Sequence, residues 1–446
     1  MKRIIIMLLI GSLLILGCTQ KESEDMDAAS ETLKVMYHDE KSFYKDYGML
    51  FSSKFPNLQV EVIPTNGVLN QENDLVSEMR KLIQEKSPDV LMLSPITYEQ
   101  FANEGILYNL DALIKQDNFD IDGILPQSIE LIKGLSNGEL FGLAPFFNSM
   151  AVFYNKDLFD QFHIPYPEDQ MSIDRFFEIT HLFGNQYSDE VQIYGTDNVF
   201  NNNFFRFIEL YGNSLGLRLV DRKEQKVTFN TEAWTKFVDR TIQSVKNGAI
   251  YTGPSQPSEV QSYEESLFSQ PFIAGKVAMT IDYYSFVHQL KEAKQRSKSE
   301  TFPNWDVVTF PVDMTSPGTT SSANPGIIFS INSKASNIKA AWKFIQYIHS
   351  DEFAKAISKA SKNVLHVRTK YIPIDEGHHM EAFYKLKWNP ISTGYSKIPP
   401  EFWKKFREMA ELEIAQLLEG KASTEEAVKR IEDQGNELMK MELQKK

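Results

Sequence analysis

Strand and helix signals alternate along the first part of the chain, and this alternation constrains the fold more than any other feature. Residues 33–37 and 58–63 alternate between apolar and polar side chains, as half-buried strands do, whereas 90–93 is a continuous apolar run typical of a central strand. Apolar residues recur at helical spacing within 43–55 and 75–83, which predicts a helix between successive strands. Because strands that alternate with helices form parallel sheets with right-handed crossovers, the sequence predicts an α/β fold.

Polar residues follow each of these predicted strands, at the edge where open α/β sheets bind their ligands. The sequence contains neither Gly-x-Gly-x-x-Gly nor Gly-x-x-x-x-Gly-Lys-Ser/Thr, the glycine patterns of dinucleotide and phosphate loops. Side chains are therefore expected to hold the ligand, and no cofactor is predicted. The candidate ligand-binding residues at this edge are His38, Asp39, Asn66 and Ser94.

The composition excludes several other classes of protein. The 446-residue chain carries a net charge of −13, so it lacks the basic footprint of a nucleic-acid-binding protein. A single cysteine excludes an intramolecular disulfide and a metal site built from cysteines. Hydrophobic residues make up 42% of the chain, with 31 Phe and 18 Tyr, which is enough to form a large core.

The start of the chain resembles the signal sequence of a bacterial lipoprotein. Lys2 and Arg3 precede an apolar run at 4–16, which is shorter than the ~20 residues of a membrane-spanning helix. The only cysteine, Cys18, follows Ile-Leu-Gly, and this pattern resembles a lipobox. The resemblance implies cleavage before Cys18 and lipidation of its thiol, and two acyl chains give stable anchoring. An ordinary signal peptide with an unrelated cysteine is the alternative.

Short motifs farther along the chain occur in the order found in one protein family. The motifs are NGELFGLAP at 137–145, VFYNKDLF at 152–159, VTFN at 227–230, KNG at 246–248, FIAGKVAM at 272–279, AWKFI at 341–345 and GKASTEEA at 420–427. Together they resemble family 1 extracellular solute-binding proteins, the maltose-binding-protein-like proteins that serve ABC importers. Each motif alone has low specificity, but their order behind a lipoprotein-like signal makes the resemblance specific.

The resemblance implies a two-lobed fold of periplasmic-binding-protein type II, in which each lobe is a mostly parallel sheet flanked by helices. Hinge crossovers join the lobes, and the Ser, Thr, Pro and Gly residues of 315–325 are typical of such a crossing. The segment 19–31 contains several acidic residues and shows no apolar periodicity, and this pattern predicts a flexible tether. The expected parts are a signal peptide (1–18), the tether (19–31), a first lobe (32–145 plus 276–324) and a second lobe (146–275 plus 325–446).

The chemistry of sugars suggests further candidate ligand-binding residues. Sugar rings have apolar C–H faces that pack on aromatic planes, and their hydroxyl groups need polar partners. Tyr283 and Tyr284 fall where the resembled family often has a stacking Trp. The other candidates are Phe146 and Asn148 at the first crossover, Asp197 after a strand at 191–194, Asp282 beside the tyrosines, and Asn324 at the later crossing. For each candidate, packing in the core or at the surface is the alternative. Trp234 and Trp342 lie on apolar helical stripes and are expected in the core.

Patterns that could indicate catalysis or metal binding have simpler explanations. Gly212-Asn-Ser-Leu-Gly216 matches the nucleophile elbow, but helical spacing precedes it and hairpin-like sequence follows it, the reverse of what the elbow needs. We therefore predict a helix-to-hairpin turn. His378 and His379 lack an accompanying ligand set and indicate an exposed polar loop. We predict that the protein is not an enzyme and has no metal site.

Together these features predict a lipoprotein on the outer face of the bacterial cytoplasmic membrane, anchored through Cys18. We expect a monomer that closes its lobes on a small solute, in this family most often a sugar or oligosaccharide, and delivers it to ABC importer permease subunits. No nucleic-acid partner is expected. The alternatives are a secreted carbohydrate-active enzyme and a ligand sensor that acts with a membrane receptor. The candidate positions lack basic clusters, which argues against a phosphorylated ligand.

Overall fold

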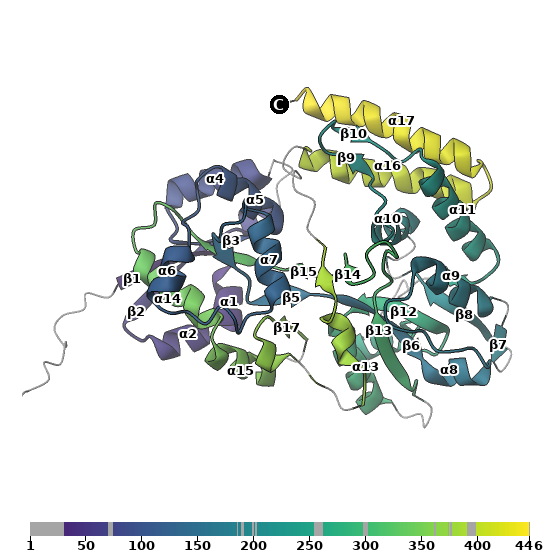
Figure 1. The fold of residues 1–446 in the computed structure, drawn as a ribbon, viewed down its shortest axis with the longest axis horizontal. Helices are drawn as coiled ribbons and strands as arrows, with labels where there is room; N and C mark the ends of the chain where they lie inside the picture. Colours follow the sequence, from purple (N-terminus) through teal and green to yellow (C-terminus); the bar gives the residue numbers. More distant parts are fainter. Residues whose placement is uncertain are drawn as a thin grey trace, which may run out of the picture.

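The computed structural model describes residues 31–69, 75–184, 186–188, 191–198, 200, 203–253, 262–297, 302–360, 363–372, 374, 377–389 and 398–445. The predicted signal peptide, the lipidation site Cys18 and all but the last residue of the predicted tether lie outside the described residues. Two α/β lobes are joined by short strands (Figure 1), which confirms the predicted two-lobed α/β fold.

The first lobe is built around a five-stranded sheet of order β2-β1-β3-β16-β4. Its strands are β1 (Glu31–Tyr37), β2 (Leu58–Pro64), β3 (Val90–Leu93), β4 (Gly142–Leu143) and β16 (Ile328–Ile331). β1 runs parallel to β2 and β3, as predicted, whereas β16 is antiparallel to β3 and β4. The helices of this part of the chain are α1 (Glu40–Phe43), α2 (Met49–Lys54), α3 (Asn66–Leu69), α4 (Leu75–Lys86), α5 (Pro95–Asn103), α6 (Asp111–Gln116), α7 (Pro126–Gly134), α14 (Ile338–Ile348) and α15 (Asp351–Ala360), with a π-helical turn η1 (Tyr44–Gly48) between α1 and α2.

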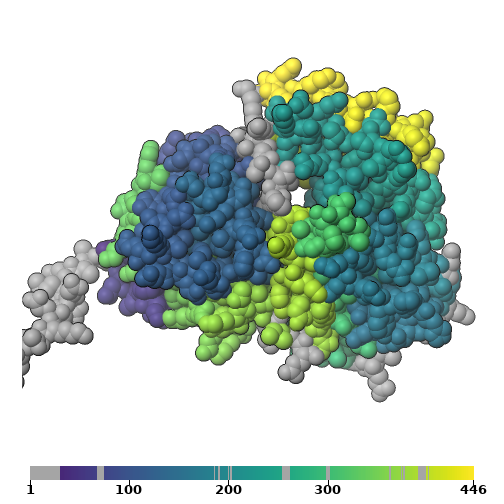
Figure 2. Space-filling view, viewed as in Figure 1, coloured from purple at the N-terminus to yellow at the C-terminus, as the bar shows by residue number. Residues whose placement is uncertain are grey.

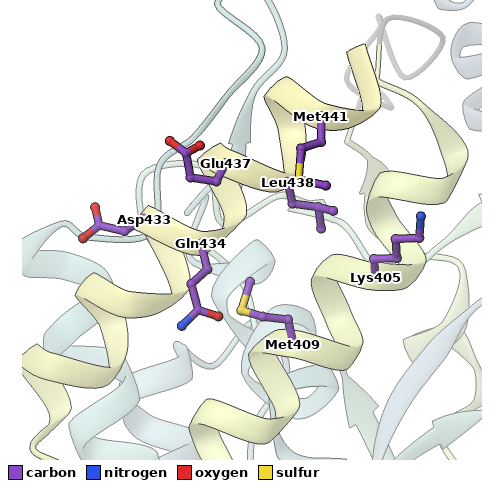
Figure 3. Close-up of a pocket in the computed structure, with 7 residues that line it drawn as sticks. All are labelled: Lys405, Met409, Asp433, Gln434, Glu437, Leu438 and Met441. Atoms are coloured by element: carbon purple, nitrogen blue, oxygen red, sulfur yellow. The ribbon is translucent and has the colours of Figure 1, made fainter. Parts of the chain in front are cut away.

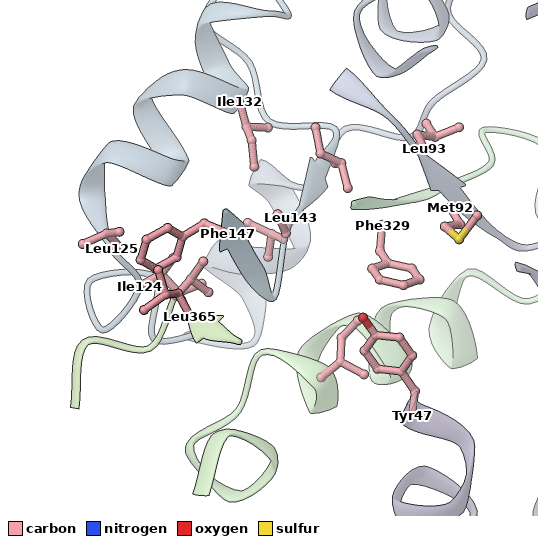
Figure 4. Packing of buried hydrophobic residues seen from close by; sticks show 14 of the residues in the cluster. Tyr47, Met92, Leu93, Ile124, Leu125, Ile132, Leu143, Phe147, Phe329 and Leu365 are labelled. Atoms are coloured by element: carbon pink, nitrogen blue, oxygen red, sulfur yellow. The ribbon is translucent and has the colours of Figure 1, made fainter. Parts of the chain in front are cut away.

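Apolar side chains of these strands and helices form a dense aromatic core (Figure 4). Leu33 and Val35 on β1 and Phe329 on β16 are fully buried. Tyr47 meets Phe329 edge to face, with ring centroids 5.2 Å apart. Burial of this surface, at about 25 cal/mol per Å², holds the carboxyl ends of β1, β2 and β3 at one edge of the sheet.

The second lobe is built around a six-stranded sheet in which β11, β8, β12, β6 and β13 are successive neighbours and β7 pairs with β8. Its strands are β6 (Met150–Asn155), β7 (Gln186–Ser188), β8 (Val191–Asp197), β11 (Ile250–Tyr251), β12 (Val277–Tyr283) and β13 (Trp305–Thr309). β11, β8 and β12 run parallel, and β6 is antiparallel to β12 and β13. The sheets of both lobes are therefore mixed, and the expectation of mostly parallel sheets was wrong, because β16 in the first lobe and β6 in the second run against their neighbours. The helices of this part are α8 (Lys156–Gln161), α9 (Ile173–Leu182), α10 (Phe204–Ser214), α11 (Glu232–Lys246), α12 (Tyr263–Ser269), α13 (Ser285–Arg296), α16 (Pro400–Leu418) and α17 (Thr424–Leu443).

A hairpin of β9 (Val220–Asp221) and β10 (Lys226–Val227) follows α10, which confirms the predicted helix-to-hairpin turn. The chain turns at Gly216, whose φ of +72° favours glycine. Trp234 and Trp342 are 1% and 3% exposed, so their predicted core positions are confirmed. None of the helices in the described part of the chain is both long and apolar enough to span a bilayer.

Short strands connect the lobes. β5 (Phe146–Asn148), β15 (Asn324–Pro325) and β17 (Leu365–His366) form an antiparallel sheet of order β15-β5-β17, and β14 (Thr319–Thr320) pairs with β18 (Lys387–Trp388). The hinge crossing expected at 315–325 thus contains two of these connecting strands. One apolar cluster runs from the first lobe past Phe147 and Trp388 to the second sheet, and another cluster lies entirely in the second lobe.

Strand pairing divides the chain between the lobes differently from the expected boundaries. β12 and β13, expected in the first lobe, pair with β6 in the second. β16, expected in the second lobe, pairs with β3 in the first, and α14 packs beside it. α16 and α17 pack on α10 and α11 of the second lobe, where they were expected. The boundaries at 276–324 and 325–446 were implied by the resemblance, and the order of motifs along a chain does not fix strand pairing, so the pairing of these segments differs from those boundaries.

Candidate functional site

A cavity of about 890 Å³ lies between the two lobes. Figure 2 shows an opening between them in this view. Small-molecule sites range from about 300 to about 1,000 Å³, so this cavity has room for a ligand larger than a single sugar ring. Both lobes and the connecting strands line it. Side chains on its wall include Ser94 and Ile96 of the first lobe, Glu209, Arg218, Arg222, Trp403 and Arg407 of the second, and Asn324 and Asn389 of the connections.

Ser94 reaches the wall because it caps helix α5. The backbone N–H of Thr97 donates to Ser94 Oγ at 3.2 Å, and Pro95 occupies the first turn of the helix. These residues follow β3 directly, so the sheet fixes where the helix begins. The amino terminus of α5, with its partial positive charge, therefore lies at the cavity.

Helices α10 and α16 supply the opposite wall. Arg407 on α16 donates from Nε to Glu209 Oε2 at 2.9 Å and from Nη2 to Glu209 Oε1 at 2.7 Å. The Arg407 guanidinium also lies over the Trp403 indole, 5.4 Å from the ring centroid. This arrangement places one aromatic ring, one carboxylate and one guanidinium side by side in the wall.

The β9–β10 hairpin adds two arginines, Arg218 and Arg222. Trp234 Nε1 donates to the carbonyl of Arg218 at 3.2 Å, and the buried Trp234 ring thereby anchors the start of the hairpin. The return strand is held from α17, because the side chain of Asn436 accepts from the N–H of Val227 at 2.9 Å. Both contacts fix the hairpin against the lobe and hold its arginines at the cavity.

Of the eleven predicted ligand-binding residues, Ser94 and Asn324 line this cavity. His38, Asp39 and Asn66 gather at the carboxyl ends of β1 and β2, where the N–H of Asn66 donates to the carbonyl of His38 at 3.1 Å. Asp39 caps α1 by accepting from the N–H of Ser42, and this hydrogen bond lowers the pKa of the Asp39 carboxyl. His38, Asp39 and Asn66 share a sheet edge with Ser94, as expected, but do not contribute to the cavity wall.

Four other candidates lie at the carboxyl ends of β8 and β12 in the second lobe: Asp197, Asp282, Tyr283 and Tyr284. Burial raises the pKa of Asp197 to about 6, and burial together with the charge of Asp197 raises the pKa of Asp282 to about 7. Tyr283 is 46% exposed, whereas Tyr284 is buried edge to face against Phe383. The two carboxyls are therefore neighbours, but none of the four lines the cavity.

Phe146 and Asn148 lie on β5 in the connection, as expected, but not in the cavity wall. Phe146 packs against His366 at 5.1 Å and against Tyr47 at 6.3 Å, so the alternative of core packing applies to it. Asn148 is exposed and pairs with Asn324 across the connecting sheet.

Sequence reasoning missed Trp403, Arg407 and the hairpin arginines. A signal for Trp403 was present: Phe402, Phe406 and Ala410 form the buried stripe of α16, and Trp403 falls beside that stripe. A large aromatic residue next to an apolar stripe faces outward, toward solvent or a ligand. The hairpin arginines had no comparable local signal, because strand-end reasoning searches only the sheet edges.

A second hollow, of about 450 Å³, lies between α16 and α17 (Figure 3). Met409, Leu438 and Met441 form its apolar floor, with charged residues at the rim. It is built from two adjacent helices of one lobe, so lobe movement would not enclose a ligand there.

The predicted polar loop at His378 and His379 is packed rather than free. The His378 ring stacks on Trp305 with centroids 3.7 Å apart, and His379 lies 2.8 Å from Asp169. Among the described residues, no group of three or more His, Cys, Asp and Glu is placed to hold a metal ion.

Residues 31–355 match the model of a family described as bacterial extracellular solute-binding protein. A sugar transporter of Rhizobium etli in an open conformation has 20% identity and a TM-score of 0.65, with 92% of this chain and 99% of that chain covered. MalE, a sugar-binding protein from Xanthomonas citri, has 16% identity and a TM-score of 0.67, with 92% and 98% covered. An ABC substrate-binding protein from Listeria monocytogenes in complex with cycloalternan has 18% identity and a TM-score of 0.59, with 92% and 98% covered. At these identities the likeness concerns the fold.

Proposed function

Because this chain belongs to the bacterial extracellular solute-binding protein family, we propose that it captures a sugar or oligosaccharide between its lobes and delivers it to an ABC importer. The similar structures include a sugar transporter and a protein with bound cycloalternan, and this supports a carbohydrate ligand. The observation that carries the proposal is the cavity of about 890 Å³ whose walls come from both lobes.

The lining suits a saccharide chemically. Trp403 offers an aromatic plane for the apolar face of a sugar ring, and Ser94, Asn324 and Asn389 offer donors and acceptors for hydroxyl groups. Apolar packing combined with a few placed polar groups is the usual composition of a small-molecule site. We propose Ser94, Asn324 and Trp403 as ligand contacts.

Capture would couple to lobe movement. A ligand that touches both walls gains contacts when the lobes approach, and this differential affinity shifts the protein toward a closed state. Moving the open-to-closed ratio from 99:1 to 1:99 takes about 5.5 kcal/mol of preference for the closed state. Several hydrogen bonds at about 1 kcal/mol each, together with one stacked ring, are of this order. The closed form would then present both lobes to the permease.

The side chains that line the cavity fit a binding role better than the role of a glycosidase. A glycosidase needs two carboxyl groups that flank the bond it cleaves, about 5–9.5 Å apart. Among the described residues that line the cavity, Glu209 supplies the single carboxylate, and it is held in the ion pair with Arg407. We expect no release of chromophore when the protein is incubated with chromogenic glycosides. Turnover by the wild type that disappears in Glu209→Gln would contradict the binding role.

We further propose anchoring through Cys18, with the protein acting as a monomer on the outer face of the cytoplasmic membrane. The support is the lipobox-like sequence before Cys18 and the extracellular family. Labelled palmitate should enter the full chain but not Cys18→Ser, which should be released from the membrane. Equal labelling of both forms would overturn the anchor without affecting ligand capture.

Isothermal titration of a protein starting at residue 31 against a saccharide panel tests the capture directly. A ligand at 100 times its Kd should stabilise the protein by about 2.7 kcal/mol. Small-angle scattering of the same sample should show a smaller radius of gyration with the ligand. Failure of neutral and acidic saccharides alike to bind would contradict the proposal.

A further inference from the structure

Residues 377–389, which we call the strap, lie along the connection between the lobes and contact both of them. A short 3-10 helix of the strap, η3 (Met380–Phe383), packs on β6 and β13 of the second lobe, whereas β18 packs on α7 of the first. The last residue of the strap, Asn389, lines the interlobe cavity. One stretch of chain therefore joins the outer part of the second lobe to the cavity wall.

Backbone pairing with β14 fixes the cavity end of the strap. The N–H of Lys387 donates to the carbonyl of Gly318 at 3.0 Å, and the N–H of Asn389 donates to the carbonyl of Thr320 at 2.8 Å. Trp388, between these two residues, is buried. The position of Asn389 at the cavity thus depends on the strap staying in this pairing.

His379 holds the other end of the strap on the second lobe. Its Nε2 lies 2.8 Å from Asp169 Oδ2, and its Nδ1 lies 3.2 Å from Glu381 Oε2. Its backbone N–H also donates to Asp306 Oδ1 at 2.8 Å. A neutral imidazole donates from one ring nitrogen, whereas an imidazolium donates from both. The protonated form of His379 is therefore the one that can donate to both carboxylates at once.

Asp169 stays ionised over the range, about pH 5 to 8, in which histidine side chains usually change charge. Partial burial would raise the pKa of Asp169, but hydrogen bonds from Lys385 Nζ at 2.6 Å and from the N–H of Thr309 at 3.0 Å outweigh that effect and lower it. Lys385 belongs to the strap and keeps its charge in this range. Lys385 thus supplies a constant part of the contact with Asp169, and His379 supplies the part that varies with pH.

Further titratable groups of the described residues surround this contact. Asp306 lies 3.9 Å from Lys156 Nζ at the start of α8. Burial is the main cause that raises the pKa of Tyr154 on β6, to about 12, and that of Tyr384 on the strap, so both phenols stay neutral between about pH 5 and 8. The ring of His378 stacks on the indole of a β13 tryptophan and needs its own control, because it is also a histidine.

We propose that His379 is a positioning residue: when protonated it clamps the strap to the second lobe and thereby holds Asn389 at the cavity wall, and its deprotonation loosens that wall. The inference goes beyond the proposed function, because it concerns the wall of the cavity rather than the ligand. The side chains of His379 and Glu381 are 39% and 55% exposed, so solvent screens their attraction and the clamp tunes the wall without being needed for folding.

Amide hydrogen exchange at Lys387 and Asn389, resolved by mass spectrometry with fragmentation, tests the proposal without a ligand. Protection is compared at pH 6 and pH 8 in the protein starting at residue 31. His379→Gln keeps one donor but cannot gain a charge, whereas His379→Arg is always charged. The controls are His378→Gln and His288→Gln; His288 is 41% exposed on α13 and lies 3.9 Å from a single carboxylate, that of Glu292. Comparison between variants at the same pH cancels the contributions of buried groups elsewhere.

In the wild type we expect the protection of both amides to fall about threefold from pH 6 to pH 8, the size of effect typical of partly exposed ion pairs. His379→Gln should show the lower protection at both pH values and His379→Arg the higher, while both controls keep the pH dependence of the wild type. Protection that does not vary with pH, or a pH dependence that persists in His379→Gln, would overturn the proposal. A change confined to residues 379–385 would also overturn it, because the clamp would then not reach Asn389.

Discussion

Arg407 on α16 and Glu209 on α10 form a two-point ion pair in the wall of the interlobe cavity, at 2.9 Å and 2.7 Å. The two residues are 198 positions apart in the sequence. The same guanidinium lies over the ring of Trp403, so a single side chain orients both the carboxylate and the aromatic surface. This geometry depends on the planar fork of arginine.

Replacing Arg407 with Lys should therefore weaken saccharide binding although the charge is kept. A lysine ammonium cannot make the paired contact with Glu209 or cover the indole in the same way, so both groups lose their orientation. We expect a loss of affinity of about tenfold by isothermal titration. Arg206→Lys is the matched control, because Arg206 approaches Glu209 only at 3.8 Å and its side chain is 46% exposed. Wild-type affinity in Arg407→Lys would show that this pair has no role in orienting the site.

Trp403→Ala should reduce affinity more than any polar substitution in the cavity. Buried aromatic contacts dominate many binding sites, and truncation of such a residue often costs about 2 kcal/mol or more. Leu412→Ala on the same helix is the control, since Leu412 is 67% exposed and lies outside the cavity wall. Thermal unfolding of both variants should stay close to that of the wild type. Equal affinities for the two variants would rule out Trp403 as a ligand contact.

Asp197→Asn should change how stability depends on pH. In the folded protein, burial raises the pKa of Asp197 from 3.8 to about 6. The folded state then binds protons more tightly than the unfolded chain, so this group's stabilising contribution is full below pH 4 and is lost as the pH rises through 6. A shift of this size corresponds to about 3 kcal/mol. Asn carries no charge, so Asp197→Asn should gain stability relative to the wild type between pH 4 and 7.

Two buried histidines oppose this trend, which is why the comparison must be made between variants. Burial lowers the pKa of His349 to about 4 and that of His366 to about 3, so protonation as the pH falls below 6.5 destabilises the folded state. Urea unfolding of the wild type and Asp197→Asn across this range cancels the histidine contribution. Asp122→Asn, at an exposed position of the first lobe, serves as control. Parallel stability curves for the wild type and Asp197→Asn would contradict the raised pKa.

Arg368→Leu should destabilise the first lobe. The Arg368 side chain is 4% exposed, donates to Asp120 Oδ2 at 2.7 Å and to the Asp120 carbonyl at 2.9 Å, and also donates to the carbonyl of His349. Loss of these charged hydrogen bonds should cost about 2–3 kcal/mol. Lys370→Leu removes a neighbouring ion pair with Asp351 from a side chain that is 74% exposed, and should cost less than about 0.5 kcal/mol. Similar losses in urea unfolding would refute a structural role for buried Arg368.

The sequence was sufficient to predict elements whose signals are local. The alternation at 33–37 and 58–63 corresponds to β1 and β2, and Gly216 lies in the turn from α10 to the hairpin. Ser94 was also found, because a polar residue after a buried strand falls at a sheet edge for a general geometric reason. These predictions needed no knowledge of distant contacts.

Features that depend on distant pairing could not be predicted in this way. The apolar strand at 277–281 suits either sheet, and only its pairing with β6 places it in the second lobe. The cavity wall likewise joins α10 to α16, about 200 residues later in the chain. Arg407 therefore becomes a site residue through tertiary packing, while Phe146, chosen for its place at the crossover, packs into the core instead.

The central claim is that the lobes close on a ligand held in the cavity between them, and a distance between spin labels tests it most directly. A protein that starts at residue 31 lacks Cys18, the only cysteine of the chain. Cysteines introduced as Glu130→Cys on the first lobe and Lys223→Cys on the hairpin can therefore be labelled specifically. Labels at Glu130→Cys and Lys81→Cys, both in the first lobe, give the control distance. Saturating saccharide should shorten the distance between lobes and leave the control distance unchanged. An unchanged interlobe distance with a saccharide shown to be bound would contradict the account.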